Sequence, residues 1–343
     1  MKTISPSLQE WKILYDLAVE FRKLECWKWM QDNDLFGVQH PDTGQVGYCS
    51  VMGNLGEHFA LAVYPGSEGL ESYMQVLVSE TEEDALDAVL RQRCLAVSFE
   101  NRKQLEREDL EVIDALSLQF KGRNNFPVFR SHRAGYVPWF LDKEHVSLLA
   151  VTLEQTMEVA AIVKGQEDFL KPPEGEMILM VRTPARDSAG LRWENRWHRP
   201  EPLPFPKEDT SRFDELHVRR LKNRSGARKA VWEVDMFYTP APVKEEGPPY
   251  YPYTLAIMEH FQGIALGVEM ASPSDYRETF RKKLLDVMEQ MPQIPHRILV
   301  KRPEASAFVR ALVTDLGIEV VHLRDLPALA DFRRGMVGFM SSR

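Results

Sequence analysis

The spacing of apolar residues near the start of the chain changes from helical to strand-like. Over 8–24 they recur every three or four positions behind Ser7, which predicts a capped helix. Two apolar runs, at 35–39 and 46–52, flank a Pro-Asp-Thr-Gly turn, and a third run follows at 59–64. Short runs joined by tight turns predict three consecutive antiparallel strands.

Helical and strand-like patterns then alternate as far as a long helix capped by Asp142. A short apolar run between turn signals predicts a strand, and an apolar period near 3.6 behind a capping residue predicts a helix. The predicted helices are 65–77, 81–92, 106–118 and the long helix from 142, and the predicted strands are 94–99 and 126–130.

A proline-rich segment divides the chain. Residues 200–206 read Pro-Glu-Pro-Leu-Pro-Phe-Pro and fit neither a helix nor a central strand, because proline lacks an N–H donor and restricts the residue before it. A hairpin is predicted just before them, from strands at 177–182 and 191–197. The predicted organisation is an N-terminal α/β lobe at 1–165, a bridging hairpin and proline-rich linker at 166–206, and a C-terminal α/β lobe at 207–343.

The C-terminal lobe repeats the order of elements. Three strands are followed by a helix, a strand, a helix, a strand and a final helix. Their predicted ranges are 230–238, 253–260, 263–270, 273–290, 297–300, 303–316, 319–323 and 326–340. The predicted fold class is α/β with mixed sheets, in which each lobe has three antiparallel strands followed by alternating helices and strands.

A short stretch of letters also recurs. Glu57-His58-Phe59 precedes an apolar strand in the first lobe, and Glu259-His260-Phe261 stands at the corresponding place in the second. One interpretation is an internal duplication of a single module. The other is a chance likeness between short apolar strands. A duplication predicts the same strand order in both lobes.

Composition and charge exclude several classes of protein. Of 343 residues, 44% are hydrophobic and 27% charged, which is typical of a folded globular chain. The net charge of −8 argues against general DNA coating. Cys26, Cys49 and Cys94 form no C-x-x-C pair and are expected to be reduced, buried thiols. With neither a signal peptide nor a long apolar run, we expect a cytoplasmic protein without a membrane contact.

The element order of the C-terminal lobe resembles the ribonuclease H-like fold. That resemblance implies a site for two metal ions, Mg²⁺ or Mn²⁺, held between converging carboxylates. Asp235 lies midway along the first strand of the lobe, where that fold has its first ligand, and Glu259 and Glu269 lie on the next two strands. The fourth strand departs from the pattern, because Val300-Lys301-Arg302 would place positive charge where the fold has an acid.

The chain as a whole resembles an uncharacterised bacterial family that pairs two domains of unknown function. The residues that suggest it are Trp29 to Gly47, Leu316-Gly317-Ile318-Glu319-Val320 and Leu326-Pro327. This resemblance implies no activity.

Two segments are candidates for contact with a partner, either a protein or a nucleic acid. The basic run at 217–229 includes Arg219, Arg220, Lys222 and Arg224, and its alternative interpretation is a solvated helix face. Tyr250 and Tyr251 lie on a proline-rich loop, where tyrosines often contact partners, and the alternative is that they cover the sheet.

The sequence contains none of the common catalytic or cofactor motifs: G-x-S-x-G, G-x-x-x-x-G-K, G-x-G-x-x-G and H-E-x-x-H are all missing. The first expectation is therefore a non-catalytic binding or scaffold module that needs no cofactor. The alternative is a divalent-metal-dependent nuclease or phosphatase with a degenerate site at Asp235, Glu259 and Glu269.

Overall fold

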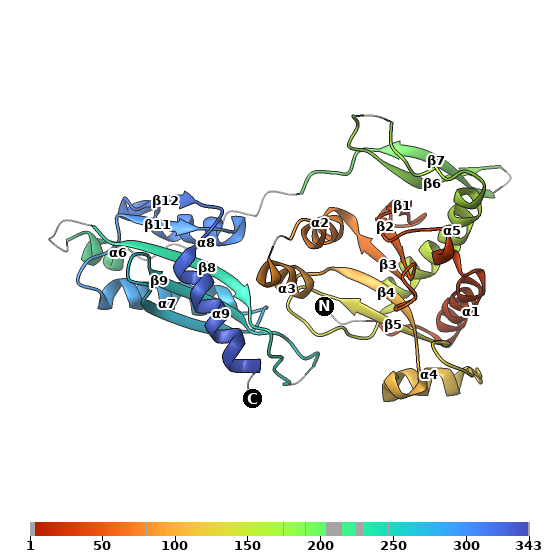
Figure 1. Cartoon of the computed structure of the whole chain (residues 1–343), viewed down its shortest axis with the longest axis horizontal. Helices are drawn as coiled ribbons and strands as arrows, with labels where there is room; N and C mark the ends of the chain where they lie inside the picture. Colours follow the sequence, from red (N-terminus) through yellow and green to blue (C-terminus); the bar gives the residue numbers. More distant parts are fainter. Residues whose placement is uncertain are drawn as a thin grey trace. The chain divides into compact units, whose positions relative to one another are not determined.

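The computed structural model describes residues 4–79, 81–173, 175–188, 190–203, 215–223, 229–245 and 247–341. The protein is mixed α/β, with one sheet of seven strands and one of five (Figure 1). The chain divides into two compact units. Unit 1 comprises Met1–Val78, Gln92–Arg133 and Pro138–Leu203, and unit 2 comprises Ser79–Arg91, Ala134–Val137 and Pro204–Arg343.

The sheet of unit 1 has the order β5-β4-β3-β2-β1-β6-β7. Its first five strands form an antiparallel meander, β6 pairs with β1 in parallel, and β7 returns antiparallel to β6. The predicted hairpin at 177–197 therefore extends this sheet. The strands are β1 (Phe36–Gln39), β2 (Val46–Met52), β3 (Ala60–Pro65), β4 (Cys94–Glu100), β5 (Phe126–His132), β6 (Leu179–Asp187) and β7 (Gly190–His198).

Helices cover both faces of the unit 1 sheet. On one face α1 (Leu8–Leu24) and α5 (Lys143–Gly165) bury a large apolar core. On the other face α2 (Gly66–Leu77) covers a smaller cluster around Tyr64 and Tyr73. α4 (Arg107–Ala115) packs beside α1. As predicted, Ser7 caps α1 and Asp142 caps α5 with side-chain hydrogen bonds.

α5 is the one helix in the described ranges whose length and apolar composition would suit a membrane crossing. More than half of its most apolar stretch is buried inside unit 1. Leu149, Leu153 and Val159 on it are fully buried in the core. α5 therefore packs as a core helix of this unit.

The sheet of unit 2 has the order β10-β9-β8-β11-β12. β8, β9 and β10 are antiparallel neighbours, whereas β11 is parallel to both β8 and β12. Its strands are β8 (Val231–Tyr238), β9 (Tyr253–Glu259), β10 (Ala265–Ala271), β11 (Arg297–Val300) and β12 (Glu319–His322). Its helices include α6 (Glu215–Lys222), α7 (Tyr276–Gln290), α8 (Pro303–Val313) and α9 (Pro327–Ser341).

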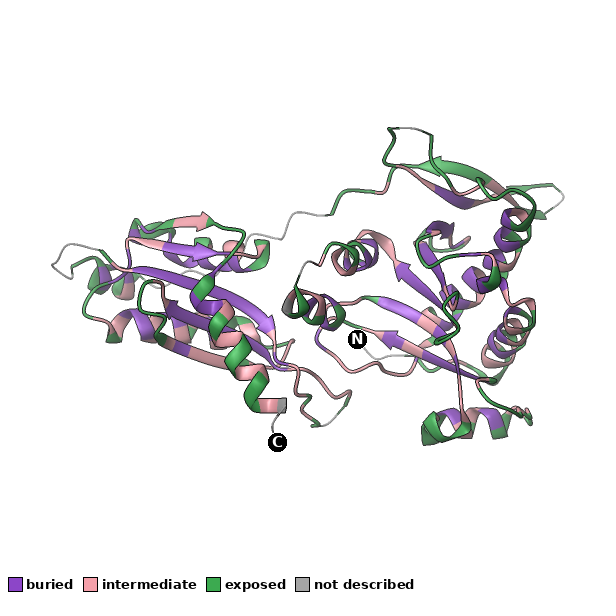
Figure 2. Ribbon diagram, viewed as in Figure 1, coloured by how far each residue is buried: buried purple, intermediate pink, exposed green. Residues whose placement is uncertain are grey.

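Both faces of this five-stranded sheet are apolar because helices cover both. One face packs Trp232, Val234 and Met236 against α7 and α8, and the other packs Val231 and Phe237 against α9. Figure 2 shows β8 and β9 almost wholly buried. Strands covered on both sides read as continuous apolar runs, which is why the central strands of this lobe were recognisable in the sequence.

Unit 2 also takes two segments from the N-terminal half of the chain. α3 (Glu82–Leu90) lies in Ser79–Arg91 and packs against β8. Ala134–Val137 runs beside the 249–251 loop, where the Tyr251 amide donates to Gly135 O at 2.8 Å. Gly135 has φ of +78°, and a Cβ there would lie 2.3 Å from the Tyr238 ring, so this close approach requires glycine. Spacing and capping placed α3 correctly along the chain but gave no sign of its neighbours.

The internal duplication predicted from the two Glu-His-Phe stretches is wrong. In unit 1 the strands β5-β4-β3-β2-β1 form an antiparallel meander. In unit 2, β11 pairs in parallel with β8, and β12 pairs in parallel with β11. The two sheets therefore differ in both order and direction. The alternative interpretation, a chance likeness of short apolar strands, accounts for the matching letters.

Candidate functional site

The three carboxylates predicted to hold metal lie on three adjacent strands of unit 2. Asp235 is central in β8, Glu259 ends β9, and Glu269 lies in β10. Glu259 pairs in register with Trp232 of β8, and Glu269 pairs with Leu255 of β9. The strand assignment made from the sequence is therefore correct for all three.

The faces of the sheet nevertheless separate them. Side chains alternate along a strand, so Glu259 shares the face of Trp232, and Glu269 shares the face of Leu255 and Met236. Asp235 points to the opposite face. Within the described ranges, no three His, Cys, Asp or Glu side chains are grouped to hold a metal ion. The structure thus does not bring the predicted trio together.

Each of the two glutamates has a local partner. Glu269 lies 3.6 Å from Lys283 of α7. Glu259 accepts a hydrogen bond from the Gln262 amide at 2.6 Å in the turn that follows β9. Both side chains are partly exposed. These contacts are those of a surface ion pair and a turn.

Asp235, in contrast, is only 2% exposed and contacts a guanidinium group. Arg302 Nη1 donates to Asp235 Oδ2, and Arg302 Nη2 lies 3.2 Å from Oδ2 of Asp87 on α3. β8 and β11 run in parallel, so the Arg302 that follows β11 reaches the carboxyl half of β8. Open α/β sheets commonly bind ligands at this edge.

α3 presents its own ion pair to the same place. Asp87 and Arg91 stand one helical turn apart, with Arg91 Nε 2.6 Å from Asp87 Oδ2. Arg91 also donates to Met236 O at 3.1 Å. Its guanidinium carbon lies 5.4 Å and 5.8 Å from the ring centres of Tyr238 and Tyr253. α3 is thus held at the carboxyl end of β8 by charge and by aromatic contact.

Four further charged side chains complete this cluster. Arg333 of α9 lies 4.0 Å from Asp87 Oδ1, and its guanidinium carbon lies 4.7 Å from the centre of the Phe237 ring. Lys301 contacts both oxygens of Asp84 at 3.0 and 3.1 Å, and Glu304 of α8 lies 3.7 Å from Arg91. We call the group the ion-pair network. Its members are Asp84, Asp87, Arg91, Asp235, Lys301, Arg302, Glu304 and Arg333.

The network perturbs the titration of Asp87 and Arg333. Burial raises the pKa of the Asp87 carboxyl, but the charges of Arg302, Arg91 and Arg333 outweigh burial and hold its pKa below the ordinary value. Burial lowers the pKa of the Arg333 guanidinium, and repulsion from Arg302 lowers it further. Asp87 is therefore ionised at neutral pH in a strongly positive setting.

Two oxygen atoms of the network are buried without a hydrogen bond. They are Oδ1 of Asp87 and Oδ1 of Asp235, in side chains that are 4% and 2% exposed. An unsatisfied buried acceptor costs about 1–3 kcal/mol, so such atoms are rare outside functional or strained sites. This network is the densest buried charge group found in the described part of unit 2, and it is the candidate functional site.

Sequence reasoning found Asp235 and placed α3, but it did not single out Asp87, Arg91 or Arg333 as members of a site. The spacing Asp84-x-x-Asp87-x-x-x-Arg91 places three charges on one helix face, and that was the available signal. The positive charge at Lys301-Arg302 was recognised as a departure from a metal site. The carboxylates of α3 that Lys301 and Arg302 contact, Asp84 and Asp87, stand more than 140 positions before Asp235 in the chain. The sequence gives no sign of these contacts.

The predicted basic run is partly described. α6 buries Val218 and Leu221 and exposes Arg219, Arg220 and Lys222. Arg219 lies 3.8 Å from Glu215, in a pair whose side chains are 75% and 91% exposed. Arg224 lies outside the described residues. α6 thus packs by one face and presents cations on the other.

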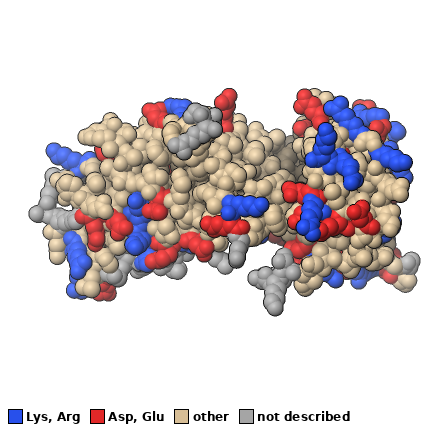
Figure 3. Space-filling view, turned by 90° about the horizontal axis from the view of Figure 1, so that it is seen from below, with Lys and Arg blue, Asp and Glu red and all other residues tan. Residues whose placement is uncertain are grey.

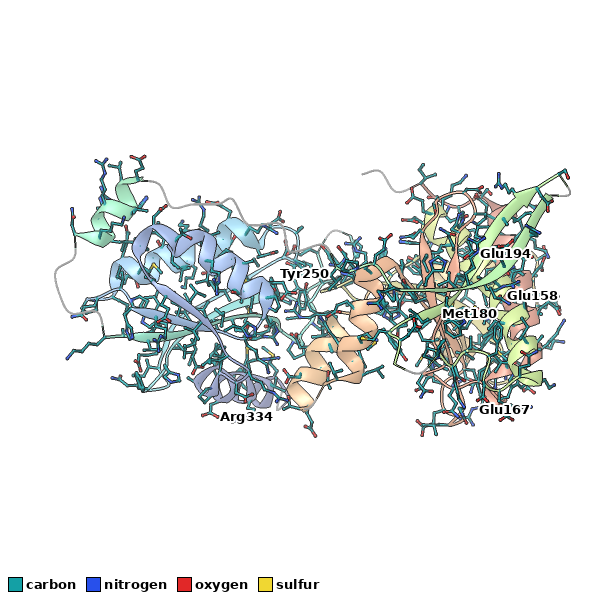
Figure 4. The ribbon with its side chains drawn as sticks, turned by 90° about the horizontal axis from the view of Figure 1, so that it is seen from above. Glu158, Glu167, Met180, Glu194, Tyr250 and Arg334 are labelled. Atoms are coloured by element: carbon teal, nitrogen blue, oxygen red, sulfur yellow. The ribbon has the colours of Figure 1, made fainter. Side chains whose placement is uncertain are left out.

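The predicted aromatic loop packs against a segment of unit 2. Tyr250, labelled in Figure 4, bridges to both Tyr136 and Val243, and its ring centre lies 6.5 Å from that of Tyr136. Tyr250 and Tyr251 are only partly exposed. Much of their surface therefore contacts the chain's own residues.

A second buried carboxylate in unit 2 is fully satisfied. Glu233 is 0% exposed, accepts the Leu329 amide of α9 at 2.8 Å and contacts Nδ1 of His260 at 2.6 Å. His260, which follows β9, is thus hydrogen-bonded to a buried carboxylate. This pair ties α9 to the sheet on the face that carries Asp235.

Unit 1 has two adjoining cavities of about 200 and 210 Å³ beside β5. Ser131, Arg133 and His145 line both of them, and Arg93 and His132 line the first. Burial lowers the pKa of His132 and of His145, so both imidazoles are neutral at pH 7. Hydroxyl, imidazole and guanidinium groups therefore line both cavities.

Comparison with known protein families matches two separate stretches of the chain. Residues 11–181 match the family described as Domain of unknown function (DUF7309), and residues 217–337 match Domain of unknown function (DUF6930). No curated protein and no solved structure matches the chain significantly. Two domains of unknown function therefore cover most of the chain.

Proposed function

We propose that this chain of two domains of unknown function is a non-catalytic binding protein that contacts a nucleic acid through the exposed cations of α6. The observation that carries the non-catalytic part is the pairing of Asp235 with Arg302. A metal site at that position needs further carboxylates around Asp235. Asp235 instead contacts the guanidinium group of Arg302, which also contacts Asp87.

The element order of unit 2 supports a ribonuclease H-like relationship. Three antiparallel strands are followed by alternating helices and parallel strands, as that resemblance predicts. In this proposal the lobe keeps the architecture and has replaced the acidic site with ion pairs. The fold alone assigns no activity, so the proposal depends on the site.

The surface of α6 supports the choice of partner. Arg219, Arg220 and Lys222 are exposed on a helix that is anchored by Leu221. An ion pair as exposed as Arg219 with Glu215 contributes little, so these cations are available to phosphate groups. Figure 3 shows acidic and basic side chains interspersed on the face that it draws, and the chain as a whole carries a net charge of −8.

We also infer a cytoplasmic location. Cys26, Cys49 and Cys94 are free and buried, as predicted. Burial raises the pKa of the Cys94 thiol to about 12, so this side chain is inert in the folded state. Free buried thiols suit a reducing compartment.

The test is retention of nucleic acid at low salt by the full chain. The variant R219E/R220E reverses two exposed charges, and R186E/R192E makes the same change on the β6–β7 hairpin, where both arginines are also exposed. We expect the wild type and the R186E/R192E control to retain single- or double-stranded nucleic acid, with affinity falling steeply as salt rises. R219E/R220E should lose retention. Equal retention by all three proteins would refute the proposal.

A further inference from the structure

The carboxylate of Asp87 lies among three guanidinium groups. Arg91 directly follows the helix that carries Asp87, whereas Arg302 precedes α8 and Arg333 lies on α9. Arg302 and Arg333 approach Asp87 at 3.2 and 4.0 Å. Planar guanidinium groups that converge on one carboxylate form the usual recognition geometry for carboxylate and phosphate groups.

The charge of the network divides unevenly between α3 and the rest of unit 2. α3 and the arginine after it contribute two carboxylates and one cation, which are Asp84, Asp87 and Arg91. The remaining elements contribute three cations, Lys301, Arg302 and Arg333, and two carboxylates, Asp235 and Glu304. The side chain of Glu304 is 47% exposed, whereas that of Arg302 is only 12% exposed. Without the two carboxylates of α3, the buried part of this site therefore carries an excess of positive charge.

Asp87 does not satisfy this site completely. Its Oδ1 accepts no hydrogen bond although it is buried, and Arg333 Nη2 lies 4.0 Å from it, beyond hydrogen-bonding distance. A carboxylate attached to a helix cannot turn freely to reach both arginines. An untethered oxyanion can accept from Arg302 and Arg333 together.

We propose that Arg302 and Arg333 form an oxyanion-binding site and that α3 is its intramolecular ligand, with Asp87 in the place of the bound anion. The external ligand is a compact oxyanion, either a carboxylate or a phosphate group carried by a small molecule or a partner. Such a ligand and the Asp87 carboxylate compete for the same guanidinium groups. This site is separate from the exposed face of α6, so the inference does not depend on the proposed function.

The test is chemical rescue of the full-length D87A variant, which removes the internal carboxylate and leaves space at its position. Sodium phosphate and sodium formate are titrated separately at constant ionic strength, and the melting temperature Tm is measured. Because a ligand that binds the folded state raises Tm, we expect an anion-dependent rise of about 3 °C or more in D87A. The wild type, whose site holds Asp87, should shift by less than a third as much.

Two variants provide the controls. D109A removes a carboxylate of similar burial in unit 1, where a single arginine, Arg130, donates to both carboxylate oxygens at 2.8 and 2.7 Å. D87A/R333Q keeps the space but removes one arginine of the proposed site. We expect a much smaller rise in D109A and loss of at least half of the rise in D87A/R333Q.

The titrations also identify the class of ligand. Rescue by formate alone indicates a carboxylate-bearing ligand, such as an acidic helix, and rescue by phosphate indicates a phosphate-bearing one. If D87A is unfolded in buffer, the same titrations are followed as recovery of the near-ultraviolet circular dichroism signal. Failure of both anions to restore D87A beyond the D109A control, or full rescue of D87A/R333Q, would overturn the proposal.

Discussion

Arg302, which precedes α8, donates to the carboxylate of Asp235 in the middle of β8. This contact places a permanent cation against the acid that a ribonuclease H-like site would use as its first metal ligand. A guanidinium group is not deprotonated at physiological pH, so the pairing holds throughout the physiological range. The contact is therefore the observation on which our proposal of a non-catalytic protein depends.

The first prediction concerns the stability that Arg302 provides. R302A leaves Asp235 and Asp87 buried without this cation, so we expect a loss of about 3–5 kcal/mol in the free energy of unfolding. R297A, at the other end of β11, breaks a pair with Glu319 whose side chains are 42% and 56% exposed, and should cost about 0–1 kcal/mol. Urea denaturation of both variants measures the difference. Equal losses would contradict a structural role for the network.

The second prediction is an acid-dependent loss of stability that Asp87 carries. Its pKa in the folded protein lies below the ordinary value of 3.8, so the unfolded chain binds the proton more tightly. The stabilisation is therefore complete above about pH 4 and is lost as pH falls through the lower folded-state pKa. Urea midpoints measured from pH 7 to pH 3 should fall more gently in D87N than in the wild type. Parallel pH profiles would show that Asp87 titrates normally.

The third prediction concerns the attachment of α9 to the sheet. E233A leaves the Leu329 amide and His260 without their acceptor in a fully buried position, so we expect a cost of about 2–3 kcal/mol in unfolding free energy. E259A removes a carboxylate that accepts one amide in a partly exposed turn, and should cost about 1 kcal/mol or less. Hydrogen exchange of the α9 amides should increase in E233A. Unchanged exchange would place the stability of α9 elsewhere.

The fourth prediction addresses the metal-dependent alternative. Millimolar Mg²⁺ or Mn²⁺ should leave Tm unchanged, because Asp235 contacts Arg302 and the sheet separates it from Glu259 and Glu269. The matched variant is D235N. A rise of several degrees in the wild type that disappears in D235N would establish a metal site at β8 and revive the nuclease or phosphatase interpretation.

The sequence by itself determined the secondary structure and the fold class. Apolar period, capping residues and proline turns placed the central strands β8, β9 and β11 and the capped helices α1 and α5 within a few residues of their observed bounds. These signals are local, because a strand or a helix reveals its buried face through its own spacing. The same signals placed Asp235, Glu259 and Glu269 on the correct strands.

Only the tertiary structure decided which of those residues meet. Sheet alternation turned Asp235 away from Glu259 and Glu269, and register is fixed by pairing across strands, which a single sequence does not display. Likewise, the folded chain brought Asp87 and Arg91 of α3 to Arg302, which follows them by more than 200 positions. Contacts of that separation depend on the packing of whole elements, so local spacing specifies which helix forms and leaves open what it touches.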